Sequence, residues 1–207
     1  MKFFVGIVLL SLAAVALADL SCSNVPVDMT TKWIDIKHSC VDAMRKQIQK
    51  EIHASYQYLA MAAYFSRDTV NRPGFAEHFF GSAKEEREHA LHLIEYLSMR
   101  GNLTSGVTNL ITSPTVKKSE WSSAVDALTD ALNLEAEVTE SIRGLIITCE
   151  TDPDSKYNDY HLVDYLTGVY LEEQYKGQRE LAGKLSTLKK MMASHGEIGE
   201  FLYDKDL

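Results

Sequence analysis

Glutamates and a histidine interrupt apolar stretches of this sequence at spacings that suit a metal site. Glu86 and His89 stand three residues apart, so on a helix both side chains project to the same side. A carboxylate oxygen and an imidazole nitrogen placed in this way can together bind one transition metal ion. Glu51 and Glu135 lie among apolar residues in other segments, and buried carboxylates are costly unless they are paired or bound to a metal. The pattern predicts a metal site inside a helical protein.

The arrangement matches part of the pattern of di-iron helix bundles. In those bundles two helices each supply one glutamate and the other two each supply a Glu-x-x-His motif. Here the fourth segment presents Gln174 in place of a second Glu-x-x-His. One iron position would then have Glu51, Glu86 and His89, and the other would have Glu86, Glu135 and a weak amide ligand. Because the second ion is poorly held, we expect iron to be oxidised and released rather than kept as a permanent cofactor.

Four long helices and a short fifth one are predicted to position these residues. The predicted helices span residues 37–66, 73–100, 119–151, 161–194 and 197–207, with Ser119 or Ser122 as the N-cap of the third. The apolar faces comprise Val41, Met44, Ile48, Ile52, Leu59 and Ala63 in the first helix, and Leu162, Leu166, Val169, Leu171, Leu181, Leu185 and Leu188 in the fourth. Residues 102–119 form a connection long enough to cross the length of a bundle. The sequence therefore predicts an all-α four-helix bundle with a long crossover between helices two and three, a pattern shared by ferritin-like and cytokine bundles.

The N-terminus has the features of a secretory signal peptide. A charged start is followed by an uncharged apolar run from Phe3 to Ala18, which ends in the small-x-small triplet Ala16-Leu17-Ala18. This run is too short to span a membrane. We expect a signal peptide over residues 1–18, an N-terminal extension over 19–36 and the bundle domain over 37–207. The mature chain would enter the lumen of the secretory pathway (ER and Golgi) or the extracellular space, where cysteines can pair.

The composition limits the partners that the chain can bind. Lys and Arg number 21 against 29 Asp and Glu, which gives a net charge of −8. This surplus of negative charge argues against a nucleic-acid partner and suits the attraction of cations. No later apolar stretch is long enough for a membrane span, so no membrane partner is expected. The triplet Asn102-Leu103-Thr104 makes Asn102 a glycosylation candidate.

Three motifs together resemble the signatures of ferritins, of the heavy-chain type and the secreted insect kind. They are Glu51-Ile-His-Ala-Ser-Tyr-Gln-Tyr58-Leu, Glu85-Glu-Arg-Glu-His89-Ala and Tyr170-Leu-Glu-Glu-Gln174. The similarity runs from about Lys37 to Leu207. It implies a ferritin-like bundle that assembles into a 24-subunit shell and stores iron as ferric oxide. It also implies ferroxidase activity, the oxidation of Fe(II) to Fe(III) by O2 at a di-iron site within the subunit.

The resemblance also assigns roles to particular residues. The implied ferroxidase residues are Glu51, Glu86, His89, Glu135 and Gln174, with Tyr58 hydrogen-bonded nearby. All six match the heavy-chain type, whereas the light-chain type replaces several of them. Glu85 and Glu88 match residues that nucleate mineral on the inner surface, and a solvated helix face is the other interpretation of both. Asp164 matches an acid that lines threefold channels, but Thr167 stands where a second acid is usual. The sequence therefore does not assign the route by which iron enters a shell.

Three cysteines leave one thiol over in a secreted chain. Cys40 opens the first helix and Cys149 closes the third, so a full-length crossover would bring both to the same end of the bundle. They can pair within the subunit, or they can simply be small buried residues. Cys22 lies in the N-terminal extension and remains for a partner chain. Secreted insect ferritins, which the sequence resembles, join heavy and light chains by disulfides, so we expect a light-type subunit as partner.

Three other interpretations remain open on the sequence alone. A light-type subunit would only shape the mineral, but the retained ferroxidase residues argue against it. A secreted cytokine shares the signal peptide and the helix count, but it does not explain acids on several apolar helix faces. A permanent di-iron oxidase or peroxidase would favour a second Glu-x-x-His motif, which this chain lacks.

Overall fold

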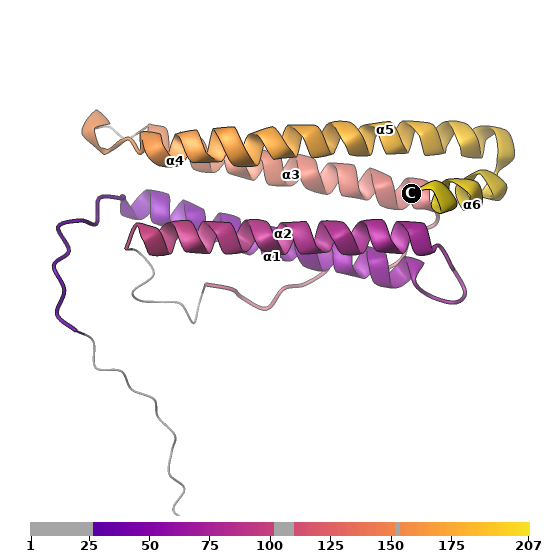
Figure 1. The fold of residues 1–207 in the computed structure, drawn as a ribbon, viewed down its shortest axis with the longest axis horizontal. Coiled ribbons are helices and arrows are strands. Elements are labelled where there is room, and N and C mark those ends of the chain that lie inside the picture. Colours follow the sequence, from indigo (N-terminus) through magenta and orange to yellow (C-terminus); the bar gives the residue numbers. More distant parts are fainter. Residues whose placement is uncertain (1–26, 102–109, 152–153) are drawn as a thin grey trace, which may run out of the picture. The chain divides into compact units, whose positions relative to one another are not determined.

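Helices account for most of the chain that the structure describes, a computed structural model covering residues 27–101, 110–151 and 154–207 (Figure 1). The helical elements are α1 (His38–Phe65), α2 (Pro73–Met99), α3 (Ala124–Glu150), η2 (Ser155–Tyr157), α4 (Tyr160–Tyr165), η3 (Leu166–Leu171), α5 (Glu172–His195) and α6 (Glu197–Asp206). The predicted signal peptide, Cys22 and Asn102 lie outside the described residues. None of the helices in the described ranges combines the length and the apolar character that a membrane crossing needs.

The long helices pack as a bundle, as the sequence predicts. Helix α1 lies along α2, and α3 lies along α5 (Figure 1). The elements α4, η3 and α5 follow one another without a break and together form the predicted fourth helix, while α6 is the short fifth. The segment η3 is a π-helix, which the spacing of apolar residues does not predict. The fold class is therefore the predicted all-α bundle.

The crossover between α2 and α3 is fastened to α1 by two glutamine side chains. The Gln57 amide accepts a hydrogen bond from the backbone N–H of Lys117 (2.8 Å) and donates one to the carbonyl of Lys118 (2.7 Å). Nearer the start of α1, the side-chain oxygen of Gln49 accepts one from the N–H of Thr112 (2.6 Å). Backbone groups of Thr112, Lys117 and Lys118 are thus satisfied by side chains of the neighbouring helix.

Helix α3 begins later than the sequence predicts. Its N-cap is Ser123, whose hydroxyl accepts a hydrogen bond from the N–H of Asp126 (3.2 Å). The expected caps Ser119 and Ser122 are wrong. The Ser122 hydroxyl instead lies 3.2 Å from the Asp126 carboxylate. Residue type alone does not distinguish these three serines, because any of them could accept a hydrogen bond from the first turn of a helix.

Two predicted core residues of α1, Leu59 and Ala63, are exposed. Leu59 leaves 45% of its surface accessible. The buried face at this end of α1 instead passes through Tyr58, Met61 and Ala62. A straight α-helix drifts by about 20° per heptad, so residues seven apart slowly leave a common face. Glu51 and Tyr58, also seven residues apart, both stay buried at the centre of the face, whereas Ile52 is only partly buried at its edge, and the same drift leaves Leu59 outside it.

The apolar core consists of two clusters separated by a polar layer. One cluster includes Met44, Ile142 and Leu162, and the other is centred on Phe65 and Phe79. Glu86 in α2, Glu135 in α3 and Gln174 in α5 each fall in the interval of their helix where neither cluster takes a residue. The bundle therefore places its buried polar side chains at one level along its axis.

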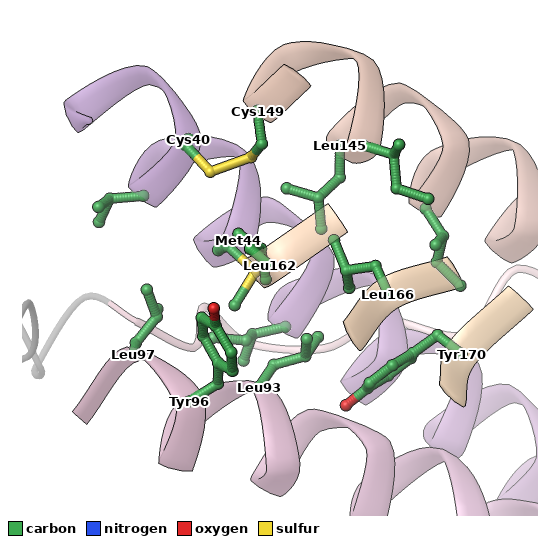
Figure 2. Packing of buried hydrophobic residues seen from close by; sticks show 14 of the residues in the cluster. Cys40, Met44, Leu93, Tyr96, Leu97, Leu145, Cys149, Leu162, Leu166 and Tyr170 are labelled. Carbon is green, nitrogen blue, oxygen red and sulfur yellow. A yellow bond between two sulfur atoms is a disulfide. The ribbon is translucent and has the colours of Figure 1, made fainter. Parts of the chain in front are cut away.

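Cys40 and Cys149 form a disulfide bond at one end of the bundle (Figure 2). Their Cα atoms lie 5.0 Å apart, within the usual range for disulfides. The bond joins the first turn of α1 to the last turn of α3, as expected if the crossover runs the length of the bundle. Both residues are also buried beside Met44 and Leu145, so they pack as apolar side chains as well.

Helix α6 closes the start of α2. The buried Asp204 carboxylate accepts a hydrogen bond from the N–H of Phe75 (3.0 Å), in the first turn of α2, where the residue before the helix supplies no side-chain cap. The two segments come so close that a Cβ atom on Gly74 would lie 1.9 Å from the carbonyl oxygen of Asp204. A glycine is required there because no larger residue leaves room for the approach.

A second carboxylate of α6 connects two further segments. Glu200 accepts a hydrogen bond from the guanidinium of Arg72 (3.0 Å) and another from the N–H of Ala124, the first residue of α3 (2.9 Å). Both side chains of the ion pair are largely buried. Helix α6 therefore satisfies backbone amides at the beginnings of both α2 and α3.

Candidate metal centre

Three side chains from two helices converge in the polar layer. Glu51 comes from α1, and Glu86 and His89 come from α2, where their spacing of three residues places them on one side. One ligand atom of each lies within 4.8 Å of the others. The Nδ1 atom of His89 is 3.8 Å from Glu86 Oε2. Glu51 and Glu86 expose 0% and 3% of their surface, and the His89 side chain exposes 13%.

Each of these residues has one buried polar atom without a hydrogen-bond partner. These atoms are Glu51 Oε2, Glu86 Oε2 and His89 Nδ1. Buried polar atoms without partners are rare in folded proteins, and three of them facing one another are costly. A divalent cation would accept lone pairs from all three at once. Two carboxylate oxygens and one imidazole nitrogen form a donor set that suits Fe(II).

Gln47 fixes the carboxylate of Glu51. Its amide nitrogen donates to Glu51 Oε1 (2.7 Å), and its amide oxygen accepts from the hydroxyl of Ser141 in α3 (2.5 Å). The carboxylate of Glu51 can only accept, so the amide nitrogen of Gln47 faces it, and the Ser141 hydroxyl donates to the amide oxygen. This arrangement occupies Oε1 of Glu51 and leaves Oε2 for a ligand. Gln47 is not among the residues predicted from the sequence, although its position four residues before Glu51 was an available signal.

Glu173 lies next to His89 on the side away from Glu86. One of its carboxylate oxygens is 3.3 Å from His89 Nε2. A carboxylate at this distance favours a proton on Nε2, which leaves the lone pair of Nδ1 free to bind a metal. Glu173 is a second residue that the sequence does not single out, because the family pattern points only to its neighbour Gln174.

The remaining predicted residues, Tyr58, Glu135 and Gln174, are connected by hydrogen bonds. The hydroxyl of Tyr58 donates a hydrogen bond to Glu135. Thr139 connects Glu135 with Gln174, because its hydroxyl lies 2.9 Å from the Glu135 carbonyl and 2.8 Å from Gln174 Oε1. The group of Glu51, Glu86 and His89 does not include Glu135, and Gln174 is joined to Glu135 through Thr139. These two are adjacent to it and line the same cavity.

A cavity of about 370 Å³ opens onto this layer. Glu86, His89, Glu135 and Gln174 line it, together with Glu85. Glu88 does not line it; this residue is exposed and lies 3.6 Å from Lys84 in an ion pair. Of the two predicted nucleation residues, the structure thus brings only Glu85 next to the candidate centre.

The electrostatics of the layer favour the neutral forms of Glu51 and Glu86 by raising the pKa of each carboxyl. Burial raises the pKa of Glu51 well above its usual value, and the neighbouring Glu86 raises it further. Burial and Glu135 raise the pKa of Glu86 in the same way. The pKa of Tyr58 is also raised, by burial and by Glu135. A bound cation would reverse this preference, so metal binding at these residues is expected to release protons.

Asp164 lies apart from this centre. It is exposed on α4, and the hydroxyl of nearby Thr167 donates to the carbonyl of Val163 rather than facing the cavity. Neither residue lines the cavity. The predicted role of Asp164 in a channel concerns contacts between subunits and stays a prediction.

Comparisons with known proteins agree with this geometry. The ferritin family matches residues 41–191 with its ferritin-like domain. The chain is 64% identical over 206 residues to a ferritin heavy chain of Drosophila melanogaster, covering 100% of this chain and 99% of the relative. It is 60% identical over 186 residues to a ferritin heavy chain of Papilio xuthus, covering 90% and 87% of the two chains.

A solved structure is similar to this chain in both fold and sequence. The crystal structure of Trichoplusia ni secreted ferritin has a TM-score of 0.85 and 57% sequence identity, and the match covers 90% of this chain and 96% of that one. Between the two bundle types that the helix pattern allowed, the cytokine is therefore excluded. The matched domain contains the whole polar layer, and this chain belongs to the ferritin family, with insect ferritin heavy chains among its relatives.

Proposed function

We propose that this protein is an iron-storage ferritin subunit that oxidises Fe(II) with O2 at the polar layer of its bundle. The observation that carries the proposal is the set of three buried, unpartnered donor atoms on Glu51, Glu86 and His89. Iron is the substrate here. It binds as Fe(II), leaves as Fe(III), and accumulates as ferric oxide.

The two iron positions are proposed to differ in strength. The first has Glu51, Glu86 and His89 as ligands. The second shares Glu86 and adds Glu135 and Gln174, where an amide replaces a charged ligand. Each O2 accepts four electrons, one from each of four Fe(II) ions when the product is fully mineralised. A weakly held second ion supports release of product after each turnover.

The assembly and the location are inferred from the relatives. We propose a 24-subunit shell that contains light-type subunits, with Cys22 available for a disulfide to such a partner. The similar structure is titled a secreted ferritin. Together with the predicted signal peptide, this similarity supports passage through the secretory pathway and export from the cell. Glu85 and Glu88 are proposed to nucleate mineral, and Asp164 to line an iron channel.

The test is aerobic oxidation of Fe(II), followed by the absorbance of ferric product. The double variant Glu86→Ala/His89→Ala should lose the fast phase. Glu95→Ala is the matched control, because it removes an exposed carboxylate from the same helix that does not line the cavity. Equal rates in the wild type and the double variant, measured on shells of equal size, would contradict the proposal.

A further inference from the structure

A continuous series of aromatic rings leads from the candidate metal centre to the end of α2. The His89 ring contacts Tyr170 (centroids 5.6 Å apart), and Tyr170 contacts Tyr165 (5.6 Å). Tyr165 stacks on Tyr96 (5.2 Å, 14° between the planes), and Tyr96 stacks on His161 (5.8 Å). All four distances lie within the range of direct ring contact. Figure 2 shows Tyr96 and Tyr170 in the same buried cluster.

The π-helical segment η3 makes one of these contacts possible. Tyr165 and Tyr170 are five residues apart, and in a regular α-helix residues at this spacing point about 140° away from each other. The i to i+5 hydrogen bonding of a π-helix widens the turn and brings such residues back to a common side. Segment η3 spans Leu166–Leu171, directly over this interval. The irregular turn therefore joins the two tyrosine rings.

The aromatic residues on the other side of the centre differ in kind. Tyr58 contacts Phe79, which contacts Phe65, which in turn contacts Phe75. Phenylalanine has no phenol and is much harder to oxidise than tyrosine. Among the described residues, the ring contacts that continue from the centre through tyrosines are those toward Tyr96.

Tyr96 is the tyrosine of this series with a base on its hydroxyl. Arg100 Nη1 donates a hydrogen bond to the Tyr96 oxygen (2.9 Å), and an arginine can only donate. His161 Nδ1 lies 2.8 Å from the Tyr96 oxygen, and the Tyr96 hydroxyl donates to it in the tautomer that carries the imidazole proton on Nε2. Arg100 is itself paired with Asp35 and Asp159, so its charge is compensated. The Tyr170 hydroxyl, in contrast, donates to the backbone carbonyl of His89 (2.7 Å), which is too weak a base to take a proton.

We propose that Tyr96 is a redox-active residue that supplies an electron to the iron site through Tyr165 and Tyr170. This inference rests on the proposed ferroxidase function, which provides O2 as the oxidant. In the step, the phenol of Tyr96 loses one electron to the site and one proton to His161 Nδ1, and becomes a neutral tyrosyl radical. A thiol or ascorbate in the surrounding solution then returns the electron and the proton.

The electron from Tyr96 is needed when the weak second iron position is empty. Two Fe(II) ions supply two electrons to O2, but a site that holds only one ion at the moment of reaction supplies one. An additional electron from Tyr96 would carry the reduction further before partly reduced oxygen escapes. His161 is exposed, so the proton and the later reductant have access from solvent at that end of the series.

The experiment is rapid-freeze electron paramagnetic resonance of the assembled protein after mixing with Fe(II) and O2. The wild type should give a transient tyrosyl signal, and Tyr96→Phe should abolish it. Tyr165→Leu should abolish it as well, although Tyr96 and its hydrogen bonds remain. Tyr64→Phe is the control. The Tyr64 hydroxyl donates to a carbonyl, and among the described residues its ring connects to Tyr58 through Phe65 and Phe79, which interrupt the series of tyrosines.

A further variant tests the role of the base. His161→Gln can accept the hydrogen bond but cannot take the proton, so the radical yield should fall about tenfold or more while the fold is unchanged. Iron oxidation is recorded in the same samples. Fe(II) oxidation without a tyrosyl signal, or a signal that survives in Tyr96→Phe, overturns this inference and leaves the ferroxidase function intact. Absence of Fe(II) oxidation in the wild type overturns both.

Discussion

His89 Nε2 and a carboxylate oxygen of Glu173 lie 3.3 Å apart, on the side of the imidazole opposite to Glu86. The two nitrogens of the His89 ring therefore have different surroundings. Nε2 meets a negative charge, whereas Nδ1 is buried and unpartnered among the candidate ligands. Residues that orient a ligand histidine in this way strengthen metal binding without touching the metal.

Replacement of Glu173 should weaken metal binding. We expect Glu173→Ala to lower the affinity for Co(II), a redox-inactive substitute under these conditions, by about tenfold, the lower end of the range for residues that support a metal ligand. The measurement is a titration followed by the absorption bands of bound Co(II). Glu172→Ala is the matched control, since the adjacent carboxylate is exposed and paired with Lys176. An equal loss in both variants would mean that only the general negative charge matters.

The buried carboxylate of Glu51 should destabilise the metal-free protein at neutral pH. Its pKa is raised in the folded state, so folding binds a proton above the unfolded pKa and stability falls as pH rises toward the folded pKa. Glu51→Gln removes this cost. It should stabilise the metal-free protein at pH 7 by about 1–3 kcal/mol, or about 2–4 °C in Tm for each kcal/mol.

The same reasoning predicts a pH dependence for that difference. Below the unfolded pKa, Glu51 is protonated in the folded and the unfolded chain alike, so the advantage of Glu51→Gln should disappear near about pH 4. Thermal unfolding of the metal-free variant and wild type at both pH values is the measurement. Glu88→Gln, at an exposed site, should leave Tm unchanged at either pH. A stabilisation that persists at the lower pH would argue for a packing effect instead.

Loss of the disulfide should destabilise the bundle strongly. Cys40 and Cys149 are 109 residues apart in sequence, and cross-links that close loops of this length restrict the unfolded chain most. Cys40→Ala/Cys149→Ala should lower the free energy of unfolding by about 4 kcal/mol. Denaturant unfolding measures the change, and Cys22→Ser is the control. If the double variant is as stable as the wild type, the bond contributes nothing to stability.

Two glycines of α2 should respond to alanine in opposite ways. Gly74→Ala places a Cβ atom 1.9 Å from the carbonyl of Asp204, so α6 must move and the protein should lose about 2 kcal/mol or more. Around Gly81, nothing beyond its own stretch of helix backbone lies within 4 Å of the position that a Cβ atom would take. Gly81→Ala should therefore add about 0.5–1 kcal/mol through helix propensity alone. Denaturation midpoints of the two variants are the measurement. Destabilisation by both would indicate that Gly81 has a role beyond helix propensity.

The helices and the candidate ligands from α1 and α2 were predictable because they depend on local spacing. Glu86 and His89 share a side of any α-helix, whatever surrounds it. The expected bond between Cys40 and Cys149 is present because it follows from the direction of the helices, which the crossover determines. These features need only the period of the helix and the order of the elements.

Other features depend on contacts that spacing does not reveal. The π-helical turn changes the period inside the fourth helix, and Val169, expected in the core, is consequently exposed. The supporting roles of Gln47 and Glu173 require knowledge of which atoms face each other across helices. Glutamine and glutamate are common on helix surfaces. Their presence in the sequence therefore does not reveal which of them face the candidate ligands.

The position of α6 has a consequence for biosynthesis. Asp204 and Glu200 supply the acceptors for backbone amides at the starts of α2 and α3, and they are translated after both of those helices. While the chain is being translated, those two helix beginnings lack their partners. The bundle can therefore reach its final form only after α6 has been synthesised, and a chain that stops before Glu197 would leave the amides at the starts of α2 and α3 without these acceptors.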